Sequence, residues 1–139
     1  MIALIIATHG FFSREIVKSS EMIFGKQDNL EVVTFDSGEN VEELTKKYYS
    51  VMKKLDVSEG VLFMVDLFGG SPFNAASRIA LEHSNVEIIS GINLPMLLEV
   101  YGLRKSCSIS ELADAAKHMA IEGIKSFKGM LNLNIEEEL

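Results

Sequence analysis

The segment IALIIATHG, residues Ile2–Gly10, begins with a run of apolar side chains and changes abruptly to threonine, histidine and glycine. An apolar run of this kind, without alternation, is typical of a strand that is buried on both faces of a parallel sheet. The segment VLFMVDLFGGSP, residues Val61–Pro72, has the same form, because its apolar run ends at Asp66. If the two runs are neighbouring parallel strands, their carboxyl ends place His9 beside Asp66 and beside a glycine-rich helix start.

Strand-like and helix-like segments alternate along the rest of the chain. Apolar and β-branched runs predict strands over Ile2–Thr8, Leu30–Phe35, Val61–Asp66 and Val86–Ser90. Amphipathic spacing predicts helices over Phe11–Gly25, Asn40–Leu55, Ser71 to about Glu82, Leu94–Leu103 and Ile109–Phe127. Strands that alternate with helices pair in parallel through right-handed crossovers. We therefore predict an α/β fold: a doubly wound, mainly parallel sheet in the order 2-1-3-4, with helices on both faces.

Three local signals refine this prediction. Asn40 is expected to be an N-cap, with Glu43 three residues further on as in a capping box. Ser71 is expected to cap the helix that follows the third strand, with Pro72 at its first position. Apolar residues alternate with asparagine over Leu131–Ile135, which indicates a short C-terminal edge strand.

The composition is that of an ordinary globular domain. The chain has 139 residues, of which 47% are hydrophobic, and a formal net charge of −7 without a basic stripe. We expect one domain over residues 1–139, cytoplasmic and soluble, with no nucleic-acid partner. Cys107 is the single cysteine and the three histidines lack metal-ligand spacing, so no metal is expected. Nothing in the sequence requires a nucleotide cofactor either.

His9 and Asp66 are the candidate catalytic residues. Ligands of doubly wound sheets bind at the carboxyl ends of the strands, where the winding reverses, and the first and third strands flank that point. Asp66 is expected to accept a hydrogen bond from Nδ1–H of His9, which leaves the Nε2 lone pair free as a nucleophile. Histidine is also the side chain best suited to carry a phosphoryl group at neutral pH.

Gly69, Gly70 and Ser71 are candidate phosphate-binding residues, with Thr8 as a further hydroxyl donor. Glycines allow the backbone to approach an anion closely, and a helix start presents free N–H groups. A tight turn with a serine cap explains the same residues without any ligand. The loop has neither the lysine of a nucleotide P-loop nor a dinucleotide fingerprint. Phe11, Phe12 and Phe68 fit either an apolar collar that docks a partner protein or simple core packing.

The segments quoted above resemble the mannose-family IIA component of the bacterial phosphoenolpyruvate-dependent sugar phosphotransferase system. The resemblance extends over nearly the whole chain, and its most specific block is Gly60–Arg78, which contains Asp66 and the run GGSPFNAASR. It weakens after about Arg104. The resemblance implies that His9 accepts a phosphoryl group from the carrier HPr and passes it to a IIB component. The membrane IIC and IID components then take part indirectly, during sugar uptake.

The resemblance also implies a homodimer in which a C-terminal edge strand, expected at Leu131–Ile135, is exchanged between subunits. Because the chain ends at Leu139, its IIB partner is expected to be a separate polypeptide. The identity of the sugar does not follow from this chain.

Other functions remain open from the residues alone. A receiver-like domain would be phosphorylated on Asp66, but Thr8 and His9 stand where such a domain needs acidic residues. A flavin- or nucleotide-binding module, a hydrolase using Ser71, and a regulatory phospho-acceptor without transfer activity are the remaining alternatives. Aspartyl phosphate differs from phosphohistidine in its sensitivity to hydroxylamine, which separates the first of these from a histidine carrier.

Overall fold

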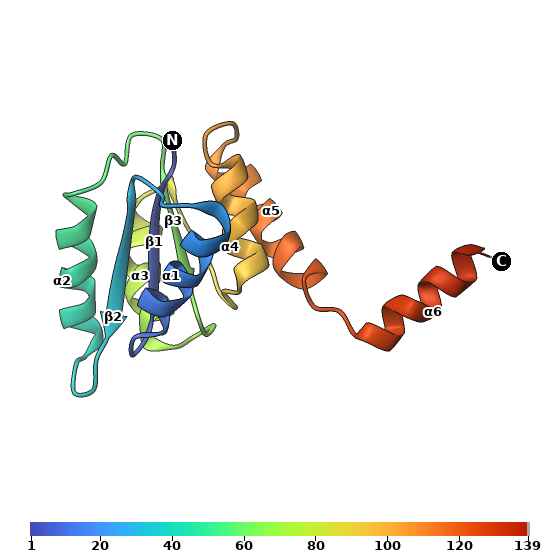
Figure 1. Ribbon diagram of the computed structural model, residues 1–139. Coiled ribbons are helices and arrows are strands. Elements are labelled where there is room, and N and C mark those ends of the chain that lie inside the picture. The colour runs from blue at the N-terminus through green and yellow to red at the C-terminus, as the bar shows by residue number, and fades with distance from the viewer. Residues whose placement is uncertain (139) are drawn as a thin grey trace.

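A four-stranded parallel sheet forms the centre of the molecule in a computed structural model that describes residues 1–138 and the side chains of residues 1–133 (Figure 1). The strands are β1 (Ala3–His9), β2 (Leu30–Phe35), β3 (Val61–Val65) and β4 (Val86–Ile89), in the order β2-β1-β3-β4. All three strand pairs are parallel. The predicted fold class and strand order are therefore confirmed.

Five helices cover the two faces of this sheet (Figure 1). Helices α1 (Phe12–Phe24), α4 (Leu94–Leu103) and α5 (Ile109–Glu122) pack on one face. Helices α2 (Val41–Met52) and α3 (Ser71–Glu82) pack on the other. Leu4 and Ile6 of β1 belong to the first core and Ile5 to the second, because successive side chains of a strand point to opposite faces. This explains why the first apolar run has no polar alternation.

The chain reverses its winding between β1 and β3. From β1 it passes through α1 on one face to β2, and it then returns through α2 on the other face to β3. The carboxyl ends of the two central strands therefore lie side by side, with Ala7 level with Val65. Asp66 follows Val65 directly and His9 comes two residues after Ala7, so the topology brings them to the same edge of the sheet.

The C-terminal part differs from the prediction. The helix expected over Ile109–Phe127 ends at Glu122, where Gly123 forms the C-cap, and a second helix, α6 (Phe127–Glu138), follows. In the single chain the segment Leu131–Ile135, predicted as an edge strand, lies inside α6, and its exchange as a strand in a dimer stays a prediction. Apolar residues at 127, 130 and 131 also fit helical spacing, and Figure 1 shows α6 projecting away from the sheet. Without a neighbouring strand, this segment forms its backbone hydrogen bonds within itself as a helix.

The described residues contain no helix that is both long and apolar enough to cross a bilayer.

Candidate active site

The imidazole of His9 and the carboxylate of Asp66 are in direct contact. His9 is the last residue of β1, and its Nδ1 lies 2.9 Å from Oδ2 of Asp66. The backbone N–H of His9 donates to the same oxygen at 3.1 Å, and the N–H of Leu67 donates to Oδ1 at 3.0 Å. The carboxylate is thus held at both oxygens. The structure brings together the two residues that the sequence analysis selected as catalytic.

This contact determines which nitrogen of the ring is free. Asp66 is a carboxylate that accepts, so Nδ1 carries the proton of the neutral imidazole and Nε2 carries the lone pair. Among the described residues, none is recorded as a hydrogen-bond partner of Nε2. The side chain of His9 is 45% exposed and that of Asp66 only 15%. The arrangement therefore offers a nucleophilic nitrogen to solvent and keeps its orienting carboxylate mostly covered.

Two further residues restrict the imidazole ring. Phe35, at the end of β2, meets it edge-on, with the ring centroids 5.7 Å apart and the planes at 88°. A methyl group placed on Gly70 would lie 3.0 Å from Cε1 of His9, so the backbone of Gly70 passes close to the ring. Neither residue was selected by the sequence analysis as a neighbour that orients the ring. The imidazole is thus bounded by Phe35, Asp66 and Gly70.

The β3–α3 loop places the start of helix α3 beside this ring. Gly69 has a positive φ of 78°, a conformation that side-chain-bearing residues rarely adopt. The predicted N-cap, Ser71, is wrong: the N-cap of α3 is Gly70, and it makes no side-chain hydrogen bond. Ser71 is instead the first helical residue, so its hydroxyl is not used as the cap. A helix start with free N–H groups and a nearby hydroxyl suits an anion.

Thr8 does not fit the phosphate-binding role that was predicted for it. Its side chain is buried, and its hydroxyl oxygen accepts the N–H of Ser13 at 2.6 Å while donating to the carbonyl of His9 at 3.1 Å. Helix α1 has no side-chain hydrogen bond from its N-cap residue, Phe11. The Thr8 hydroxyl therefore accepts one N–H group at the start of α1 and donates to the chain at His9, so it is already engaged on both sides.

Tyr48 is bonded to the start of α3, which follows the β3–α3 loop. It was not selected from the sequence. It is fully buried on α2, and its hydroxyl donates to the carbonyl oxygen of Pro72 at 2.9 Å. Burial raises the pKa of Tyr48, and the negative charge of Asp66 raises it further. The phenol consequently remains a neutral donor that fixes the first turn of α3.

Exposed apolar side chains follow both the histidine and its aspartate closely along the chain. Phe11 and Phe12 lie at the start of α1, and Leu67 and Phe68 lie in the β3–α3 loop; all four are exposed. A hollow of about 490 Å³ opens on the β2 side of the ring, between His9, Phe35 and the loop residues 36–38. Large apolar residues gathered around a polar site are typical of a surface that meets another protein.

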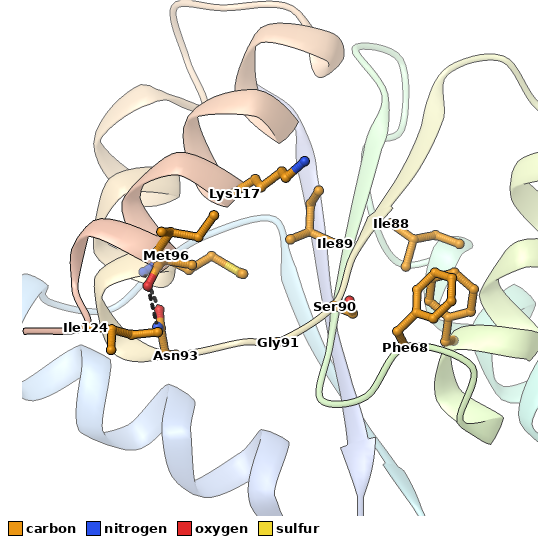
Figure 2. Close-up of a pocket in the computed structure, with 12 residues that line it drawn as sticks. Phe68, Ile88, Ile89, Ser90, Gly91, Asn93, Met96, Lys117 and Ile124 are labelled. Atoms are coloured by element: carbon orange, nitrogen blue, oxygen red, sulfur yellow. Dashed lines mark hydrogen bonds between the residues drawn. The ribbon is translucent and has the colours of Figure 1, made fainter.

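A groove, separate from the hollow beside His9, runs along β4, the strand at one edge of the sheet (Figure 2). It encloses about 430 Å³ and is mostly apolar, with Phe68 on one side and Met96 and Ile124 on the other (Figure 2). Phe68 packs against Phe73 with ring centroids 4.7 Å apart. The loop that borders His9 therefore also forms one wall of this groove.

The other two histidines lie away from the site. His83 is the C-cap of α3 and His118 lies on α5, and both are exposed. Among the described residues no group of three or more histidine, cysteine or acidic side chains is arranged to hold a metal ion.

The fold and the site together define a doubly wound α/β domain that presents an aspartate-held histidine at the switch point of its sheet. The chain belongs to the EIIA-man family: the family model described as "PTS system fructose IIA component" matches residues 3–117.

Curated relatives and solved structures agree with this assignment. The chain is 41% identical over 120 residues to the fructose-specific EIIA component of Bacillus subtilis, which covers 86% of this chain and 82% of that protein. It is 44% identical over 128 residues to the mannose-specific EIIAB component of Escherichia coli, covering 91% of this chain but only 40% of that longer protein. The crystal structure of an EIIA component from Streptococcus agalactiae has 30% identity and a TM-score of 0.82, covering 92% of this chain and 98% of that chain.

Proposed function

We propose that this protein is the phosphoryl-carrying IIA component of a sugar phosphotransferase system and works in the cytoplasm. His9 accepts a phosphoryl group from phospho-HPr and passes it to a IIB component. One observation carries this proposal: Nδ1 of His9 is held 2.9 Å from Asp66 on a half-exposed ring, which leaves Nε2 open. The assignment to the EIIA-man family supports the same role.

The transfer step follows from the geometry of the ring. The lone pair on Nε2 attacks the phosphorus of the donor's phosphohistidine, so a new N–P bond forms on His9. The N–P bond of the donor breaks, and its electron pair stays on the donor's ring nitrogen. The positive charge that develops on the imidazole of His9 is balanced by Asp66, which keeps the proton on Nδ1 in place. The reverse sequence, with a IIB component as the acceptor, returns His9 to its neutral state.

The phosphoryl oxygens need donors on the protein. The start of α3 supplies the backbone N–H and the free hydroxyl of Ser71, and Gly69 and Gly70 allow the group to approach the backbone. Phosphoryl transfer requires positioning and charge stabilisation more than a complex set of catalytic groups. Thr8 is left out of this set because its hydroxyl is already occupied.

The test is phosphorylation of the purified chain by phosphoenolpyruvate and the upstream components of the phosphorelay. We expect a mass increase of one phosphoryl group that is labile to acid and resistant to hydroxylamine. Addition of the cognate IIB component is expected to remove the group from this chain. Label that persists in the presence of IIB would support the alternative of a regulatory phospho-acceptor, and hydroxylamine-labile label would indicate Asp66 as the acceptor.

We further propose that the chain works as a homodimer in which residues 131–135 of one subunit, which are helical in the single chain, become extended and pair with the open edge of β4 in the other. The groove along β4 supports this arrangement, because its walls are apolar and the strand edge has no strand partner among the described residues. Leu131 and Leu133 are exposed in the single chain. Such an addition of a strand to an open sheet edge is a common mode of association.

The dimer is tested by sedimentation equilibrium. Wild-type protein is expected to sediment as a dimer, and the double variant Leu131→Asp, Leu133→Asp as a monomer, because charged side chains do not enter an apolar groove without a large desolvation cost. Leu81→Asp is the matched control, since Leu81 is exposed on α3. A wild-type monomer at every concentration, or a double variant that dimerises fully, would contradict the proposed exchange.

A further inference from the structure

The two neighbouring glycines beside His9 occupy backbone conformations of different kinds. Gly69 has a φ of +78° and is required there by its backbone alone. Gly70 has φ −75° and ψ 171°, an extended conformation that any residue adopts without strain. The backbone conformation therefore requires a glycine at position 69 but does not require one at position 70.

Helix capping does not explain Gly70 either. It is the N-cap of α3, a position where serine, asparagine and aspartate are favoured because their side chains accept a backbone N–H of the first turn. Helices α2, α4 and α5 use such residues, Asn40, Asn93 and Ser108, and each of them accepts the expected N–H. Helix α3 lacks a side-chain cap because its N-cap residue has no side chain.

The surroundings of Gly70 supply the missing reason. A Cβ at this position would lie 3.0 Å from Cε1 of His9, shorter than an ordinary van der Waals contact between carbon atoms. The next nearest atoms, Cβ and the carbonyl oxygen of Leu67, are 3.6 Å away and would tolerate it. The imidazole would have to move, but Asp66 holds its Nδ1 and the ring of Phe35 packs against it at nearly a right angle. Cε1 also lies between the two ring nitrogens, so a shift there displaces both of them.

We infer that Gly70 is a positioning residue for phosphoryl transfer: its missing side chain lets the imidazole of His9 lie beside the start of α3. In this position Nδ1 reaches Asp66 and Nε2 stays open. The inference rests on the proposed function, since it takes His9 as the phosphoryl acceptor. It also explains why α3 has no side-chain cap: any side chain at position 70 would occupy the space of the reacting ring.

A side chain at position 70 is expected to lower the rate of transfer without lowering the thermal stability. Gly70→Ser adds a cap hydroxyl without backbone strain, so its thermal midpoint is expected to equal or exceed that of the wild type. Its kcat for phosphorylation by phospho-HPr is expected to fall about tenfold or more, since small misplacements of reacting groups have effects up to about a hundredfold. Gly70→Ala is expected to show the same loss of kcat. The KM for phospho-HPr should stay unchanged in both variants.

Gly102→Ala is the matched control, because a Cβ at Gly102 on α4 meets no atom within 4 Å. It should keep the full transfer rate. The ¹⁵N resonances of the His9 ring give a second readout: the two Gly70 variants should lose the pattern of an Nδ1–H, Nε2-lone-pair imidazole, and Gly102→Ala should keep it.

The possible results are distinct. Wild-type kcat in both Gly70 variants would overturn the inference and leave the proposed function intact. A rise in KM alone would have the same consequence, because it would assign Gly70 to partner docking. A lower thermal midpoint, with activity falling only in proportion to the unfolded fraction, would show a structural role and also overturn it. Failure of the wild-type chain itself to accept phosphate would instead refute the proposed function.

Discussion

His9→Ala is expected to abolish phosphorylation of this chain by phosphoenolpyruvate and HPr. Among the described residues of the site, His9 alone offers a free nitrogen lone pair to a phosphorus atom, and no described neighbouring side chain is placed to substitute for it. Asp66 is mostly covered and held at both oxygens by N–H groups of His9 and Leu67. The stoichiometry of incorporated phosphate, measured by intact-protein mass spectrometry, is expected to fall from one per chain to zero.

The variant should fold normally, because the side chain of His9 is half exposed and lies outside both hydrophobic cores. His83→Ala and His118→Ala are the matched controls, since both histidines are exposed and lie away from the site. Both should reach the wild-type stoichiometry. Undiminished labelling of His9→Ala would eliminate His9 as the acceptor, and full loss in either control would move the site elsewhere.

The sheet and the pairing of His9 with Asp66 could be predicted because they depend on long, unambiguous patterns. The run at Ile2–Ala7 is apolar on both faces, which is typical of a strand in a parallel sheet that is covered by helices on both sides. Once β1 and β3 are neighbours in parallel, the residues that follow them meet at one edge whatever the details of packing. Topology alone therefore located the candidate site.

The finer features of the site depend on single hydrogen bonds, which the sequence pattern does not determine. Ser71 and Gly70 are both residues that occur at an N-cap. If the helix began one residue later, the serine hydroxyl would cap it; because Gly70 is the N-cap, that hydroxyl is not used for capping. Thr8 at the end of an apolar strand gives no sign that its hydroxyl turns toward Ser13. The contact of Tyr48 with Pro72 joins residues 24 positions apart. No local signal could have revealed it.

Arg104, outside the site, is another residue whose contacts the sequence pattern does not reveal. Charged residues are rarely buried, so an arginine in this stretch is expected at the surface. It is in fact buried, and its guanidinium donates to the backbone carbonyls of Ile2, Asp28 and Asn29. Those partners belong to the start of β1 and the turn before β2. A group that joins three separated segments becomes visible only after the chain has folded.

Asp66→Asn is expected to preserve the fold and to slow phosphoryl transfer by about 10²–10⁴-fold, as when a carboxylate that orients a catalytic histidine is replaced by its amide. The substitution keeps the shape of the side chain but turns one oxygen into an NH₂ group. If that NH₂ faces His9, it meets the backbone N–H and forces Nδ1 to accept, so the proton moves to Nε2 and the nucleophilic lone pair is lost. If it faces Leu67, it opposes the N–H that Asp66 normally accepts.

Either orientation also removes the negative charge that balances the imidazole during transfer, so the rate falls even where the tautomer is correct. The measurement is the single-turnover rate of phosphoryl transfer from phospho-HPr, together with the ¹⁵N resonances of the His9 ring, which report the position of the proton. Asp114→Asn on the exposed face of α5 loses the same charge away from the site and should keep the wild-type rate. A wild-type rate in Asp66→Asn would leave the carboxylate with no part in the reaction, and the close contact between the two side chains would then be purely structural.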